Sequence, residues 1–154
     1  MFENADGRGL RFECQQCSYC CTGSPGFVWL SDADIANLCA FFSLDFEEFS
    51  RTYCRSIEVE GGTSLSLKEK SGYDCIFLES DHCSVYAARP IQCRTYPFWG
   101  EIIETERSWK SEAALCPGIG AGPLVSPEQI AASFLEMRAH PRRVFADGET
   151  EGTR

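Results

Sequence analysis

The chain has 154 residues, of which 44% are hydrophobic and 12% aromatic, and this composition favours a single globular domain over a disordered chain. Its formal net charge of -9 argues against nucleic acid and anionic membrane surfaces as partners, since both attract basic proteins. No apolar run approaches the about 18 residues of a membrane span, and the first residues lack the basic and apolar segments of an export signal. We therefore expect a cytoplasmic protein.

The polar, glycine-containing start of the chain predicts a flexible lead-in over 1–11, followed by one cysteine-cluster metal-binding domain over 12–145 and a flexible tail over 146–154. The domain opens with CQQCSYCC at 14–21, which places four thiols within eight residues. In a reducing compartment such spacing is more typical of metal ligands than of disulfides. A disulfide-bonded exported protein remains the alternative.

The next segments predict a short strand, two helices and a second strand. Phe27–Leu30 is apolar and favours a strand, and Ser31 can cap a helix that follows it. A second helix is expected over 45–55, and the alternating pattern of 64–68 predicts a strand after the Gly61-Gly62 turn. The residues expected on the buried faces of the two helices are Ile35, Leu38, Cys39, Phe42, Phe46, Phe49, Tyr53 and Cys54.

Further along the chain, 75–78 and 83–86 predict a hairpin, and the prolines that bracket 88–97 allow only a short helical turn. Two more strands are expected at 98–104 and 107–112.

The last helix is predicted to begin after Ser126, which has proline next to it and glutamine three residues on. We expect it to bury Ile130, Phe134 and Leu135. The whole pattern predicts an α+β fold: a small single domain with short strands and three to four helices, organised around a cysteine-rich metal site.

Cysteines two residues apart can bind one ion or cluster, and Cys14, Cys17 and Cys20 extend this spacing to three ligands. Bacterial ferredoxins use the same spacing for three corners of a cubane cluster, with a fourth cysteine that precedes proline. Cys116 precedes Pro117 and fits that role. Four cysteines then remain for a second four-sulfur site, although the ligands could be divided differently: Cys21, Cys75, Cys83 and Cys93.

Four thiolates suit an iron–sulfur cluster or zinc, and the three-cysteine run favours iron–sulfur. Two cysteines, Cys39 and Cys54, fall on apolar helix faces and are predicted to be buried in the core instead. His82 is expected to face solvent in the hairpin turn.

The segments FECQQCSYCCTGSPGFVWLS, CIFL, CSVYAARPIQCRTYPF and CPGIG occur in this order, and with them the chain resembles the YkgJ-type cysteine-cluster family. That family is described as a proposed zinc- or iron-chelating domain with a CxxCxxCC signature. The resemblance covers about residues 12–122 and implies a metal site built from Cys14, Cys17, Cys20, Cys21, Cys75, Cys83, Cys93 and Cys116. It also marks Arg89, Pro90, Arg94, Tyr96 and Pro97.

Arg89 and Arg94 are candidates for a role beside the cofactor. A site with several thiolates is negatively charged, and guanidinium groups can hydrogen-bond its sulfurs and shift a reduction potential. The alternative is that both arginines pair with surface carboxylates of this acidic protein.

Three functions fit these observations. The first is an iron–sulfur protein that transfers electrons or assists a redox or protein-modifying enzyme. The second is a zinc-structured module whose acidic surface binds a basic protein partner. The third is a metal-dependent protein-modifying enzyme, as in the larger flagellin lysine methylases that contain similar modules. No GxGxxG, P-loop or acid pair at informative spacing identifies a catalytic residue in the sequence.

Overall fold

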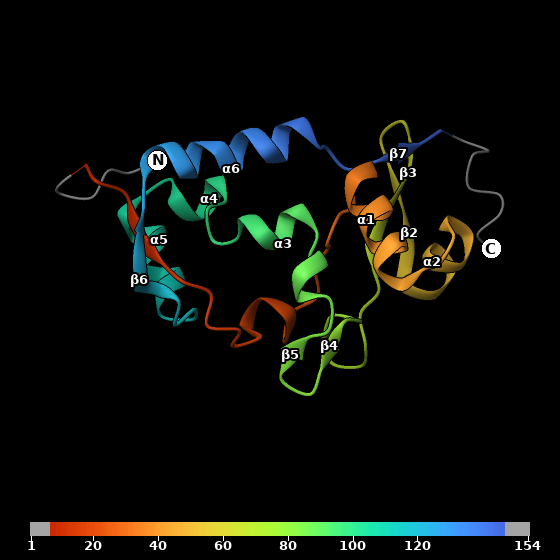
Figure 1. Ribbon diagram of the computed structural model, residues 1–154, viewed down its shortest axis with the longest axis horizontal. Coiled ribbons are helices and arrows are strands. Elements are labelled where there is room, and N and C mark those ends of the chain that lie inside the picture. Colours follow the sequence, from red (N-terminus) through yellow and green to blue (C-terminus); the bar gives the residue numbers. More distant parts are fainter. Residues whose placement is uncertain (1–6, 147–154) are drawn as a thin grey trace.

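The computed structural model describes residues 7–146, which form a small α+β domain that is longer than it is wide (Figure 1). Its elements in chain order are β1 (Leu10–Phe12), η1 (Tyr19–Cys21), α1 (Asp32–Phe42), α2 (Phe46–Tyr53), β2 (Cys54–Val59), β3 (Gly62–Leu67), β4 (Leu78–Glu79), β5 (His82–Cys83), η2 (Tyr86–Ala88), α3 (Ile91–Thr95), α4 (Gly100–Ile103), α5 (Glu106–Ala113), β6 (Ile119–Val125), α6 (Pro127–Ala139) and β7 (Val144–Phe145).

One apolar core lies between the sheet β2-β3-β7 and the helices α1 and α2. The side chains of Leu30, Leu38 and Phe49 are completely buried in it. The segment 27–30, predicted as a strand, runs beside β3 with Leu30 N donating to Leu65 O, but it forms only an isolated bridge. This core, which we call the sheet core, lies at the end of the molecule that carries α2 (Figure 1).

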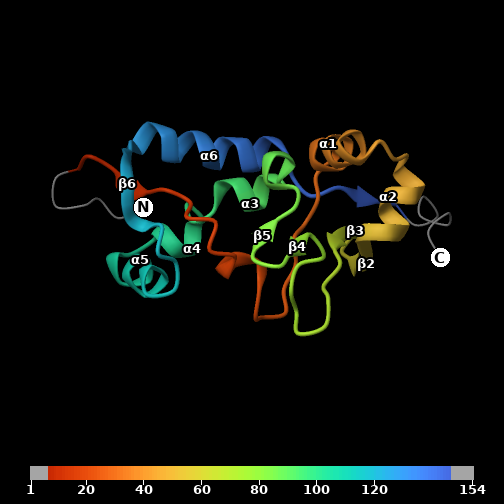
Figure 2. The same ribbon diagram turned by 60° about the horizontal axis from the view of Figure 1, so that its bottom comes forward.

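A second apolar core, which we call the helical core, lies at the opposite end. It is formed by the antiparallel pair β1-β6 together with α4, α5 and α6. Leu10, Ile103, Trp109 and Ile130 are buried there. Figures 1 and 2 show α6 running along one side of the molecule from this core towards α1, while α3, η1 and the β4-β5 hairpin lie between the two ends.

Two of the helix starts follow the predicted capping signals. The side chain of Ser31 accepts a hydrogen bond from Asp34 N, and the Asp34 carboxylate accepts one from Ser31 N, which closes a capping box at α1. Ser126 and Gln129 make the same reciprocal pair at α6, with Pro127 in the first turn. The short helix α3 confirms that prolines limit 88–97 to little more than one turn.

The two strands predicted at 98–104 and 107–112 are wrong. Both segments are helical, as α4 and α5, so the fold has more helices than the three to four expected. Thr105 and Ser108 form a capping box that starts α5, a signal that the sequence contains and that the strand prediction overlooked. In this register Ile103 and Trp109 both face the helical core.

Smaller differences concern where elements begin and end. The second helix stops at Tyr53, so Cys54 is buried on strand β2 and not on a helix. Phe46 and Leu135, which were expected to be buried, are 38% and 66% exposed. Strand β1 begins at Leu10, inside the predicted lead-in, because pairing with β6 buries this residue. The rest of the lead-in before residue 7, and the tail beyond residue 146, lie outside the described residues.

Within residues 7–146, none of the helices combines the length and the apolar content that crossing a membrane would require.

Candidate metal centre

The eight predicted ligands come from six separate parts of the middle of the chain. Two lie in the loop between β1 and η1, two in η1, and one each before β4, in β5, in α3 and between α5 and β6. In that order they are Cys14, Cys17, Cys20, Cys21, Cys75, Cys83, Cys93 and Cys116.

The β1-β6 pairing brings the first and last of these cysteines to the same end of a strand pair. Glu13 N donates to Gly118 O over 3.1 Å, so the loop that begins at Cys14 passes beside the turn that contains Cys116. A Cβ atom at Gly118 would lie 2.5 Å from Glu13 O, a distance that no side chain could accept. Glycine at 118 therefore allows the close approach of these two segments.

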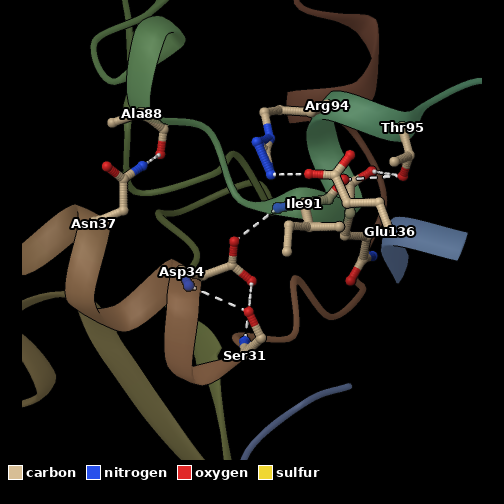
Figure 3. A network of polar contacts seen from close by, with 9 residues as sticks. Ser31, Asp34, Asn37, Ala88, Ile91, Arg94, Thr95 and Glu136 are labelled. Carbon is tan, nitrogen blue, oxygen red and sulfur yellow. Dashed lines mark hydrogen bonds and ion pairs between the residues drawn. The ribbon is translucent and has the colours of Figure 1, made fainter. Parts of the chain in front are cut away.

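A buried carboxylate holds the helix that carries Cys93 (Figure 3). Asp34 is only 5% exposed, and its Oδ1 accepts a hydrogen bond of 2.8 Å from Ile91 N, the first amide of α3. Its Oδ2 accepts from both the amide and the hydroxyl of Ser31. No residue before α3 caps it with a side chain, so the Asp34 carboxylate of α1 caps it instead. This contact fixes the position of Cys93 relative to the sheet core.

The segment around Cys75 is tied directly to the cysteine run. Cys75 N donates to Cys21 O over 2.8 Å, which joins residues far apart in the sequence. Ser18 Oγ also donates to Asp81 O, in the turn of the β4-β5 hairpin that carries Cys83. These hydrogen bonds therefore bring the segments of Cys75 and Cys83 to the cysteine run.

Two adjoining cavities divide the eight cysteines. The large cysteine cavity has a volume of about 320 Å³, and its cysteine lining is Cys20, Cys21, Cys75 and Cys93. The small cysteine cavity, of about 50 Å³, is lined by Cys14, Cys17, Cys20, Cys21, Cys83 and Cys116. Cys20 and Cys21 belong to both. This division differs from the predicted one, because Cys83 lies on the side of Cys14 and Cys116, and Cys20 also faces Cys75 and Cys93.

The adjacent thiols of Cys20 and Cys21 interact with each other. Their sulfur atoms are 3.9 Å apart and form a hydrogen bond. This bond lowers the pKa of Cys20 to about 7 and raises the pKa of Cys21. The thiolate of Cys20 is thus the favoured anion of the pair, and the Arg89 guanidinium adds to its stabilisation.

Burial affects the other thiols of the centre in the opposite direction. It raises the pKa of Cys75, Cys83 and Cys93, and the negative charges of neighbouring thiolates raise the pKa of Cys93 further. Several thiolates can coexist here only if positive charge compensates them. A bound metal cation would supply this positive charge and would allow several thiolates to coexist.

Arg89 lies among these thiols, whereas Arg94 has a described partner elsewhere. Arg89 lines the small cavity, and its positive charge favours the thiolates of Cys20, Cys83 and Cys93. Its guanidinium lies 3.6 Å from the centre of the Tyr86 ring. Arg94 instead donates to Glu136 on α6 over 2.7 Å (Figure 3). For Arg94 this ion pair is the alternative expected from the sequence, in which the arginine pairs with a surface carboxylate.

Tyr86, Tyr96 and Glu112 belong to the surroundings of the thiols, although no chemical role was predicted for them. Tyr96 Oη donates to Glu112 Oε1 over 2.6 Å, and Tyr96 lines both cavities. Burial, this bond and the nearby Cys116 raise the pKa of Tyr96. A hydrogen bond to Cys14 raises the pKa of Tyr86. The YP of RTYPF marks Tyr96, but nothing in the sequence connects Tyr96 with Glu112.

The two remaining cysteines and the hairpin histidine lie outside both cavities. Cys54 is buried in the sheet core and Cys39 packs against it, as predicted for small apolar side chains. Burial raises the pKa of Cys54 to about 12. His82 is exposed and lies 3.5 Å from Asp81, in agreement with the expected position in a turn.

The donor set fits a thiophilic metal, although the thiols do not yet converge. In the part of the chain that the structure describes, no three His, Cys, Asp or Glu side chains are arranged closely enough to hold one ion. The eight thiols are nevertheless soft donors that line two cavities, and the guanidinium of Arg89 lies at the small one. Soft sulfur donors of this kind select zinc or iron. Binding would require side-chain rotations on a backbone that already gathers the cysteines.

These features define a class of proteins in which cysteines from separated segments surround a metal. The chain belongs to the CxxCxxCC family, described as a proposed zinc- or iron-chelating domain, whose model matches residues 13–117. The match spans more than half of the chain and supports metal binding. No solved structure matches the fold.

Proposed function

We propose that the protein carries an iron–sulfur cluster on its grouped cysteines and acts in electron transfer, or as an accessory to a redox or protein-modifying enzyme. One observation carries the proposal: all eight cysteines of the family pattern line two adjoining cavities, while Cys39 and Cys54 belong to the sheet core. An iron–sulfur cluster would supply iron that accepts and returns one electron.

The residues around the thiols suit an anionic cluster. Arg89 brings a positive charge to the small cavity, and Tyr86 and Tyr96 bring hydroxyl groups close to Cys14 and Cys116. Charges and hydrogen bonds to the sulfurs are among the factors that set the reduction potential of such clusters.

A protein partner is part of this proposal, since an electron carrier or accessory must contact another protein. Two aromatic residues at the large cavity, Phe27 and Tyr73, are 46% and 53% exposed. Exposed aromatic side chains are enriched at protein interfaces. Trp99, at the same cavity, is half-buried and donates to Gln92 O in the cavity wall.

The test is anaerobic purification followed by elemental analysis, measurement of acid-labile sulfide and an absorption spectrum. We expect iron and sulfide in comparable amounts and a brown protein with absorption near 400 nm. A colourless protein that contains stoichiometric zinc and no sulfide would overturn the iron–sulfur assignment. Cys39→Ser is a matched control, since the loss of a thiol outside the cavities should leave the metal content unchanged.

A zinc-structured interaction module is the second candidate, and the Cys20–Cys21 pair favours it. Their sulfur separation of 3.9 Å is close to that of two thiolates on one tetrahedral ion. In this function the metal holds the middle of the fold, and the acidic surface binds a basic partner. Zinc analysis distinguishes the two candidates, and unfolding by a chelator tests the structural role.

A further inference from the structure

We propose that Cys20, Cys21, Cys75 and Cys93 bind a single tetrahedral metal ion, separate from the centre held by Cys14, Cys17, Cys83 and Cys116. This inference rests on the proposed function, because both centres use the thiols of the same family pattern. It changes the division of ligands predicted from the sequence, because Cys20 and Cys83 exchange places, and it assigns each of the eight cysteines to one of two sites.

The cavity linings are the first support for this division. Cys75 and Cys93 line only the large cysteine cavity, while the other set lines only the small one. Cys20 and Cys21 line both and lie on the wall between them. If this pair joins Cys75 and Cys93, each cavity receives four sulfur donors, which is the number that a zinc ion or an iron–sulfur cluster requires.

The spacing of the shared pair is the second support. Two thiolates bound to one tetrahedral ion at about 2.3 Å are about 3.8 Å apart. The sulfur atoms of Cys20 and Cys21 are 3.9 Å apart before any metal is bound. Neighbouring residues usually point their side chains in different directions, but the short η1 helix aims these two at a common point. A single ion suits this spacing better than two iron atoms at opposite corners of a cluster.

Hydrogen bonds hold the three segments of the proposed site in place. Cys75 N donates to Cys21 O, and Asp34 anchors the α3 helix that carries Cys93.

The experiment measures metal and acid-labile sulfide per chain in full-length protein purified without oxygen, for wild type and single Cys→Ser variants. We expect Cys75→Ser to lose one equivalent of metal and to keep all of its sulfide. Cys116→Ser should lose the other centre and keep the single ion. Cys39→Ser should retain both. Because Cys93 is deeply placed in α3, Cys93→Ser is compared with wild type by circular dichroism before its metal content is interpreted.

Cobalt provides a second, spectroscopic readout. Wild-type protein grown with cobalt should show the visible bands of a tetrahedral thiolate site, and these bands should be weaker in Cys75→Ser. If every variant of the eight loses all metal together, or if Cys75→Ser keeps the full metal content, the two-site division is wrong while the proposed function stands. Wild-type protein without any metal would overturn both.

Discussion

The sheet core and the cysteine-lined middle of the molecule are stabilised in different ways. In the sheet core, Leu38, Phe49 and Leu65 are almost completely buried, and the ring of Phe42 stacks on those of Tyr53 and Phe77. In the middle, the thiols lie on loops, very short helices and the two-residue strand β5, and Cys17 and Cys20 are exposed. Apolar burial stabilises the first region, and under the proposed function a bound metal adds stability to the second.

Metal removal is the strongest way to separate the two regions. Structural zinc contributes about 10–16 kcal/mol in small metal-dependent domains, so a chelator should destabilise the cysteine-lined middle by several kcal/mol. Hydrogen exchange would then accelerate at 14–21 and 75–93 and remain slow in β3 and around Phe49. Equal acceleration throughout the chain would show that the sheet core also depends on the metal.

Phe49→Ala tests the sheet core. Phe49 is completely buried, so its truncation should lower the free energy of unfolding by about 3–5 kcal/mol, through lost burial and the cavity left behind. Denaturant unfolding of the purified protein measures this loss. Phe41→Ala is the matched control, because Phe41 is 47% exposed and its truncation should cost less than about 1 kcal/mol. The metal content of folded Phe49→Ala should equal that of wild type, and a loss would mean that the two regions are coupled.

Asp34→Asn tests the link between the regions. The amide cannot reproduce all three hydrogen bonds that the carboxylate accepts, so the expected loss of stability is about 2 kcal/mol. Because Asp34 anchors α3, metal affinity should also fall. Asp32→Asn serves as the control: Asp32 is exposed and lies 3.4 Å from Arg143, a surface pair worth at most about 1 kcal/mol. Unchanged affinity in Asp34→Asn would show that α3 positions Cys93 without this cap.

Tyr96→Phe should have the smallest effect, and it is a local test of the cysteine-lined middle. The change removes the hydrogen bond to Glu112 but keeps the ring, so stability should fall by about 1 kcal/mol. If the hydroxyl also acts on the metal centre through Cys116, the absorption spectrum or reduction potential should shift while the metal content stays the same. An identical spectrum would restrict Tyr96 to a structural role.

The helix predictions succeeded where capping side chains and apolar spacing agreed. Ser31 and Ser126 each closed a capping box, and the helices they start were expected. The predictions that failed were the two strands at 98–104 and 107–112, because short apolar runs such as Ile102-Ile103 are compatible with either a strand or a helix. Packing against the helical core decided for helix there, because Ile103 and Trp109 both reach it only in that form.

The sequence by itself singled out eight cysteines as candidate ligands, from the spacing of Cys14, Cys17 and Cys20, the proline after Cys116 and the resemblance to the CxxCxxCC family. It also indicated that Cys39 and Cys54 are core residues, from their apolar neighbours. Only the tertiary structure decided which thiols face one another, which arginine lies beside them and that Glu112 reaches Tyr96. Those relations join segments up to about a hundred residues apart, and backbone contacts such as Glu13 with Gly118 and Cys75 with Cys21 create them. No local pattern encodes such distances.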